Sequence, residues 1–138
     1  MAKVKGTALR STVEFLQARV GEEGYRELLE GMSAEDVAIL EAPVLLSGWY
    51  EFSLLKRLMK RAEGKVPVPR GRTLAWELGR FSAESALSTI YKLFFKMADP
   101  AYFVKKASYL YPTYYDSGSM EVVGLPAKAA PIRIRDFA

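Results

Sequence analysis

The chain has 138 residues, of which 50% are hydrophobic and 26% are charged, and it carries a net charge of +4 with no histidine and no cysteine. This length and composition predict one globular domain with a core of its own. The two missing residue types exclude disulfides, cysteine nucleophiles, and the commonest general base and metal ligand. No apolar run is long enough to span a bilayer and the first residues lack a secretory-signal pattern, so we expect a cytoplasmic protein.

Apolar residues at helical spacing predict a series of short helices in the first part of the chain. A first helix is expected over 9–20, where Gly21 ends it, and a second over 22–30. Ser33 is the expected N-cap of a third helix, which Pro43 breaks. The acidic residues at the starts of these helices have an ordinary structural role there, because carboxylates favour the positive end of the helix dipole.

A fourth amphipathic helix is expected after Ser47 as its cap. It ends at Gly64, ahead of a stiff, basic linker at 65–72. The cations of this region are either a solvated helix face or a site for an anionic partner. The candidate anion-binding residues are Lys56, Arg57, Lys60, Arg61, Arg70 and Arg72. No aromatic residue interleaves with them, so nucleic acid is the less favoured anion.

The segment 71–118 is rich in aromatic and small residues, and we expect the rest of the chain to be arranged around it. Thr73 is the expected N-cap of a long amphipathic helix, Asp99 with the proline after it restarts a shorter one, and Pro112 ends that one. Small side chains on one face of the helix that begins after Thr73 predict close packing within the monomer or a helix–helix contact in a dimer. The candidate dimer-contact residues are Gly79, Ala83 and Ala86.

The aromatic rings of this segment are expected to meet between helices and sheet. They could form a plain core, or they could line a pocket for a small apolar or aromatic ligand, with some phenol groups at its edge. The candidate ligand-binding residues are Trp49, Trp76, Phe81, Tyr91, Phe94, Phe95, Tyr102 and Tyr109.

After Pro112 the apolar pattern changes to a period of two. Residues 113–116 and 120–123 flank an Asp/Gly turn and predict a β-hairpin. Residues 132–135 alternate strictly and predict a further strand. Because this strand comes so late, we expect the natural chain to continue past Ala138.

These elements predict an α+β fold in which helices pack on a small antiparallel β-sheet. The N-terminal half is helix-rich, and the hairpin and strand lie at the C-terminal end. We expect a single domain over 1–138, made of a helical part (1–64), a linker (65–72) and a helix–sheet part (73–138).

Five short stretches carry a resemblance to a known group of proteins. They are Val4–Thr7, Phe15–Gly24, Ser47–Tyr50, Leu78–Arg80 with Ser82–Glu84, and Tyr114–Gly118. Together they resemble an uncharacterised myxobacterial paralogue family, itself similar to V4R (4-vinyl reductase) domains, haem-NO-binding-like domains and the Bet3-like subunits of the TRAPP tethering complex.

The resemblance implies helices packed on an antiparallel sheet, frequent dimerisation, and a role in small-molecule sensing or protein assembly. It also implies a closing C-terminal helix, which this chain lacks. The histidine that holds haem and the acylated cysteine known in parts of this group are absent here, so no haem of that type, and no other cofactor, is expected.

The sequence contains no catalytic motif and no carboxylate cluster at metal-binding spacing, so we expect a protein that is not an enzyme and has no metal site. The favoured interpretation is a homodimeric sensory module that binds a small apolar or aromatic ligand. The alternative is a protein-interaction scaffold without a ligand. An anion or nucleic-acid binder acting through the basic residues 56–72 is a third and less favoured interpretation.

Overall fold

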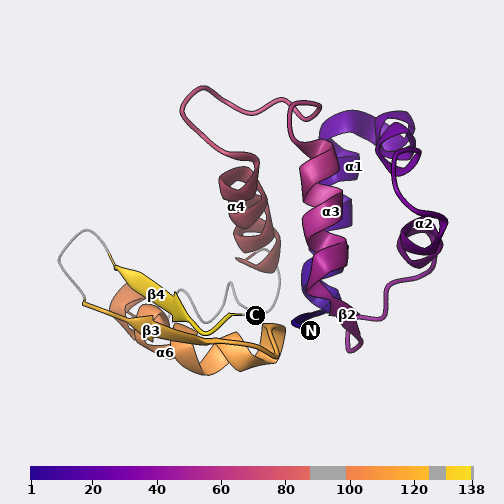
Figure 1. Ribbon diagram of the computed structural model, residues 1–138. Helices are drawn as coiled ribbons and strands as arrows, with labels where there is room; N and C mark the ends of the chain where they lie inside the picture. Colours follow the sequence, from indigo (N-terminus) through magenta and orange to yellow (C-terminus); the bar gives the residue numbers. More distant parts are fainter. Residues whose placement is uncertain (88–98, 125–129, 138) are drawn as a thin grey trace.

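The computed structural model of the chain describes residues 1–87, 99–124 and 130–137 (Figure 1). Helices predominate and two small antiparallel sheets accompany them, so the α+β prediction is confirmed. No helix within these ranges is both long and apolar enough to cross a membrane. The elements are β1 (Lys3–Lys5), α1 (Gly6–Leu29), α2 (Ala34–Glu41), β2 (Trp49–Glu51), α3 (Phe52–Ala62), α4 (Leu74–Leu87), α6 (Pro100–Tyr114), β3 (Ser119–Val122) and β4 (Ile132–Arg135).

The helix boundaries of the N-terminal half follow from local chemistry. Gly21 has φ 72° and interrupts α1, so the predicted first and second helices form one bent element. The Ser33 hydroxyl accepts a hydrogen bond of 3.2 Å from the Asp36 backbone and caps α2, as predicted. Thr73 caps α4 in the same way, accepting from the Trp76 backbone at 3.1 Å.

The hydrophobic core lies among α1, α2, α3 and the first turn of α4. Its most deeply buried members include Leu9, Phe15, Leu16, Leu54 and Leu58. The expectation that segment 71–118 forms the centre of the fold is therefore wrong for the described side chains. Beyond Leu74, only Glu77 and Tyr111 are buried among them.

A two-stranded sheet at the base of α1 and α3 was not predicted. Val4 is fully buried and lies opposite Tyr50 in the antiparallel pairing of β1 with β2. The expectation that Ser47 caps α3 is wrong, because β2 intervenes and the helix begins after Glu51 without a side-chain cap. Strands of three residues are too short to show an alternating pattern in the sequence.

The C-terminal part begins as predicted and then departs from the prediction. Asp99 caps α6 by accepting a hydrogen bond of 3.0 Å from the Ala101 backbone. Pro112 does not end the helix, which continues to Tyr114, so the predicted hairpin of 113–116 with 120–123 is wrong. Pro112 has no backbone N–H, so the helix loses one hydrogen bond, which is a small loss in its last turn.

The hairpin at the C-terminal end is instead formed by β3 and β4, and the predicted strand at 132–135 is confirmed as β4. Met120 lies opposite Ile134, and Val122 opposite Ile132, so these apolar side chains share one face. The predicted turn before β3 is also present, and Gly118 adopts φ 78° there.

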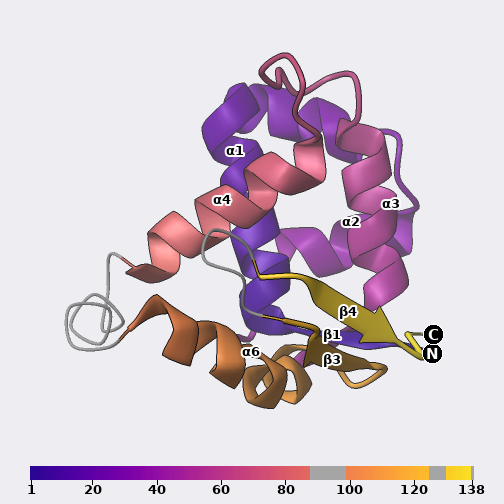
Figure 2. The ribbon, with the colours of Figure 1, turned by 90° about the vertical axis from the view of Figure 1, so that its left-hand side faces the viewer.

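The C-terminal part docks on the N-terminal sheet. Val4 forms an antiparallel bridge with Tyr115, and the backbone of Asp116 donates to the carbonyl of Lys3 at 3.2 Å. The rings of Phe52, Tyr115 and Phe137 meet at the same place, with 4.8 Å between the centroids of Phe52 and Phe137. Figure 2 shows the result, with α4 lying across α1 and with α6 and the β3–β4 hairpin below them.

Candidate functional site: a groove between α3 and α4

An open groove lies between two helices that pack on the same third helix. Helices α3 and α4 both pack against α1, whereas close backbone packing between α3 and α4 is sparse. Figure 1 shows α3 in front of α1, with α4 to the left of both. The space between them is a groove of about 960 Å³, which we call the α3–α4 groove. Its apolar lining includes Phe52, Leu55, Met59, Val66, Leu78 and Tyr115, and its charged lining includes Lys56 and Lys60.

The groove exists because the apolar stripe of α3 is wider than its contact with the core. Leu54, Leu58 and Ala62 are buried at helical spacing and fill the core. Leu55 and Met59 lie one position further round the helix and are only half-buried. The sequence predicted an amphipathic helix here, but it could not indicate that part of its apolar face borders open space.

A second groove adjoins the first and lies between α1 and α4. This α1–α4 groove has a volume of about 830 Å³, and Leu55, Ala75, Leu78 and Tyr115 line both grooves. The hydroxyls of Ser11 and Ser82 lie 2.7 Å apart across it and link the two helices. The candidate dimer-contact residues Gly79, Ala83 and Ala86 all line this second groove.

Two ion pairs to one buried carboxylate fix α4, which forms one wall of each groove. Glu77 is only 2% exposed and receives hydrogen bonds from Arg19 on α1 at 2.8 Å and from Arg72 at 3.1 Å. The hydrogen bonds from Arg72 and Arg19 lower the pKa of the Glu77 carboxyl below its usual value, against the opposing effect of burial. The Arg72 guanidinium also lies 4.0 Å from the centre of the Trp76 ring.

The described candidate rings do not gather at one site. Phe81 packs against Phe15 with 5.5 Å between ring centroids, whereas Trp76 is half-exposed beneath Arg72. Trp49 is 42% exposed and lies beneath Lys5 on the separate β1–β2 sheet.

The remaining candidate rings belong to α6 or fall outside the described residues. Tyr102 and Tyr109 are exposed on α6, on either side of Lys106, whose amino group lies 5.6 and 5.0 Å from their ring centres. The last three candidates, Tyr91, Phe94 and Phe95, lie outside the described residues. None of the described candidates lines either groove.

The candidate anion-binding residues also divide into different environments. Arg57 forms a two-bond pair with the buried Asp36, at 2.7 and 2.6 Å, and this pair lowers the pKa of the Asp36 carboxyl. Since Arg72 is bound to Glu77, neither arginine is a free cation. Arg70 is exposed on the linker.

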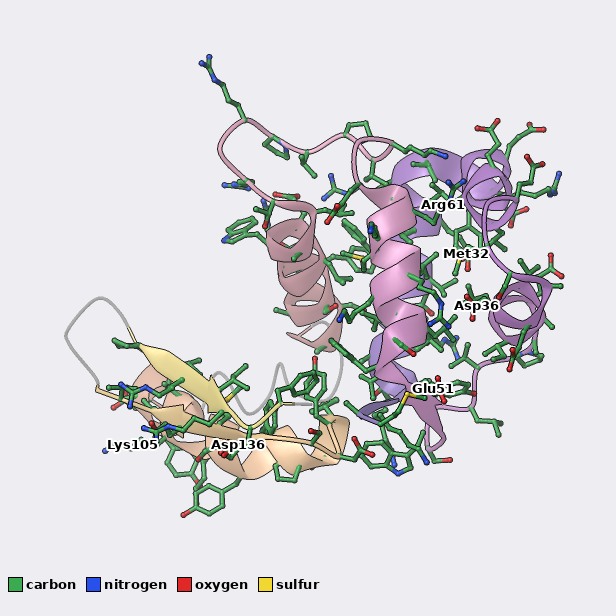
Figure 3. The ribbon with its side chains drawn as sticks, viewed as in Figure 1. Met32, Asp36, Glu51, Arg61, Lys105 and Asp136 are labelled. Atoms are coloured by element: carbon green, nitrogen blue, oxygen red, sulfur yellow. The ribbon has the colours of Figure 1, made fainter. Side chains whose placement is uncertain are left out.

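The other three cations of the predicted set lie on α3. Lys56 and Lys60 border the α3–α4 groove, and Arg61 is directed toward α1, where its Nε donates to the carbonyl of Leu28. Figure 3 shows Arg61 between α3 and the end of α1. The basic segment is therefore not one continuous anion-binding surface.

Comparison of the chain with models of known families, with curated proteins and with solved structures gives no match. The family resemblance therefore stays a prediction. Within the described ranges, no group of three or more His, Cys, Asp or Glu side chains could hold a metal ion.

Proposed function

We propose that this chain is a small-molecule-binding, sensory module whose apolar or aromatic ligand lies in the α3–α4 groove. The observation that supports this proposal is the groove itself, because its volume of about 960 Å³ is that of a ligand site and its lining is mostly apolar. Ligand sites have volumes of roughly 300–1,000 Å³ and combine an apolar lining with a few polar groups.

The polar groups at the edge of the groove narrow the class of ligand. Lys56 and Lys60 place amino groups at the side formed by α3, where their alkyl stems can lie along apolar surface. This arrangement suits a ligand with an apolar body and an acidic group at one end. Most lining residues have no acid–base chemistry, which favours binding without catalysis.

The resemblance to the V4R group supports the same proposal, because domains of that group sense small molecules and commonly dimerise. A cytoplasmic homodimer is part of the proposal. It is the arrangement in which a sensor passes a change at its groove to a partner.

Filling the groove with a side chain tests the proposal. Ala75 is exposed on α4 and lines the groove, so Ala75→Phe places a ring in the ligand's space without altering the core. Native mass spectrometry and thermal-shift assays over a panel of aromatic and acyl compounds should detect a ligand for the unaltered protein and not for this variant. Ala42→Phe is the matched control, since Ala42 is exposed and borders neither groove.

A scaffold without a ligand is the second candidate, and the surroundings of Gly79 favour it. A Cβ atom added at Gly79 would meet nothing within 4 Å, so this small residue faces open space in the α1–α4 groove instead of an internal neighbour. A helix from a second copy could approach closely there. Because Gly79→Leu fits the monomer, a lower molecular mass for this variant than for the unaltered protein in light scattering would report a lost interface. If both proteins are monomers, this dimer is excluded.

A further inference from the structure

A third cavity lies beside α3, on the side that faces away from α4 (Figure 3). It has a volume of about 590 Å³ and lies between the start of α2 and the second half of α3. Figure 3 shows Arg61, Met32 and Asp36 one after another along this space. We call it the Arg61 pocket; its lining includes Gly31, Met32, Asp36, Lys60, Arg61 and Lys65.

The charges around this pocket do not cancel. Four cations line it, and the two carboxylates that line it are Asp36 and Glu63. Asp36 is already bound to Arg57 by two hydrogen bonds. Within the described part of the chain, the other three cations form no ion pair. They are Lys60, Arg61 and Lys65.

The Arg61 guanidinium is held in position by the backbone of the neighbouring helix end. Its Nε donates to the carbonyl of Leu28 at 3.3 Å. The group also occupies the space that a side chain at position 31 would take, because a Cβ atom added to Gly31 would lie 2.0 Å from Arg61 Nη2. The two Nη groups form no hydrogen bond with any described residue, so the donors that recognise oxyanions are unengaged.

We propose that the Arg61 pocket binds the phosphate group of a small phosphate monoester. A positioned guanidinium offers two N–H groups to two phosphate oxygens, and the lysines on either side supply charge for a dianion. The Gly31–Met32 wall provides room and apolar contact for the organic part of the ligand. This site is distinct from the α3–α4 groove, although Arg57, Lys60 and Glu63 border both.

The same facts disfavour a nucleic-acid strand as the ligand. A strand needs a row of free cations along its backbone and rings for its bases. Here Arg57 and Arg72 are bound to carboxylates of the protein, and no aromatic side chain lines the pocket. Three of the cations that form no ion pair within the described ranges, Lys60, Arg61 and Lys65, gather in one compact pocket.

Calorimetric titration of the full chain with inorganic phosphate and with phenyl phosphate tests the site. The unaltered protein should bind both at low ionic strength and more weakly as salt is added. Arg61→Gln should reduce the affinity about tenfold or more, since a charged hydrogen-bond donor is lost. Gly31→Ala should have a similar effect although it leaves the net charge unchanged, because the new methyl group displaces the guanidinium.

Arg70→Gln is the matched control, because it removes the same charge from the exposed linker and should leave the affinity unchanged. Circular dichroism checks that each variant is folded, and Lys65→Gln replaces Arg61→Gln if the latter unfolds, since Lys65 is exposed. Absence of phosphate binding by the unaltered protein would overturn the proposal. An equal loss in Arg70→Gln would also overturn it, by showing that only overall charge matters.

Discussion

Arg19 on α1 donates a hydrogen bond of 2.8 Å to the buried carboxylate of Glu77 on α4, although 58 positions separate the two residues in the chain. Together with Arg72, this pair fixes the first turn of α4 against α1. Since α4 forms one wall of both grooves, the shape of each groove depends on an ion pair outside it.

Replacement of Glu77 should loosen α4. Glu77→Gln leaves two arginines facing an uncharged side chain in a buried place, so we expect a clear fall in melting temperature. Glu84→Gln on the same helix is the control, because Glu84 pairs with Arg80 at the surface and its loss should have no measurable effect. Equal melting temperatures for the two variants would contradict the role given to Glu77.

The same carboxyl should make stability depend on acid. The pKa of Glu77 is lowered from its ordinary value of 4.5, so the stabilisation is fully present above pH 4.5 and is lost as the pH falls through the lower, folded-state pKa. Asp36 behaves alike from its ordinary value of 3.8. Urea unfolding between pH 3 and pH 6 should therefore show a smaller acid loss in Glu77→Gln than in the unaltered protein.

The location of the core makes a prediction about two leucines. Leu58 on α3 is fully buried and Leu110 on α6 is 51% exposed. Leu58→Ala should lower the free energy of unfolding by about 2–5 kcal/mol, whereas Leu110→Ala should change it by about 0.5 kcal/mol or less. Denaturant titration measures both, and the reverse order would place the core in the C-terminal half.

Two glycines separate backbone strain from steric contact. Gly64 and Gly118 both have positive φ, but an added Cβ atom meets nothing at Gly64 and lies 2.7 Å from the Arg135 carbonyl at Gly118. Gly64→Ala should therefore cost about 1–2 kcal/mol from conformation alone. Gly118→Ala should cost more and disturb the β3–β4 hairpin, which amide hydrogen exchange of β3 would detect.

Tyr25 carries a buried hydroxyl without a hydrogen-bond partner among the described residues. Burial, and then the negative charge of Glu41, raises its pKa to about 12. The folded protein is therefore destabilised as pH rises from the ordinary value of 10 toward 12. Tyr25→Phe should change stability at pH 7 by about 1 kcal/mol or less. It should also reduce the alkaline loss, to which Tyr111 and Tyr115 contribute as well because burial raises their pKa values. Tyr109→Phe, at an exposed site, should leave the alkaline loss in place.

Local chemistry could be predicted from the sequence. Ser33, Thr73 and Asp99 cap helices as expected, because each cap depends only on residues two or three positions away. The break in α1 at Gly21 and the strand at 132–135 were predictable because they too follow from local sequence.

Contacts between distant parts of the chain could not be predicted. The pairing of Asp36 with Arg57 joins separate helices, so the sequence showed only an acidic helix start and a basic helix face. Leu55 and Leu78 belong to the apolar faces of two predicted amphipathic helices, and only the packing of α3 and α4 on α1 leaves them at a groove. The aromatic density of 71–118 does not locate the core, because exposed rings such as Tyr109 contribute to it as much as buried ones.

Titration with a fluorescent polyene fatty acid, cis-parinaric acid, tests the proposed ligand groove most directly. The unaltered protein and the Ala42→Phe control should bind it saturably with one equivalent per chain. Ala75→Phe should bind it at least about tenfold more weakly, because the new ring covers apolar surface that the fatty acid would otherwise bury. Equal affinity of Ala75→Phe and the unaltered protein would show that the α3–α4 groove is not the ligand site.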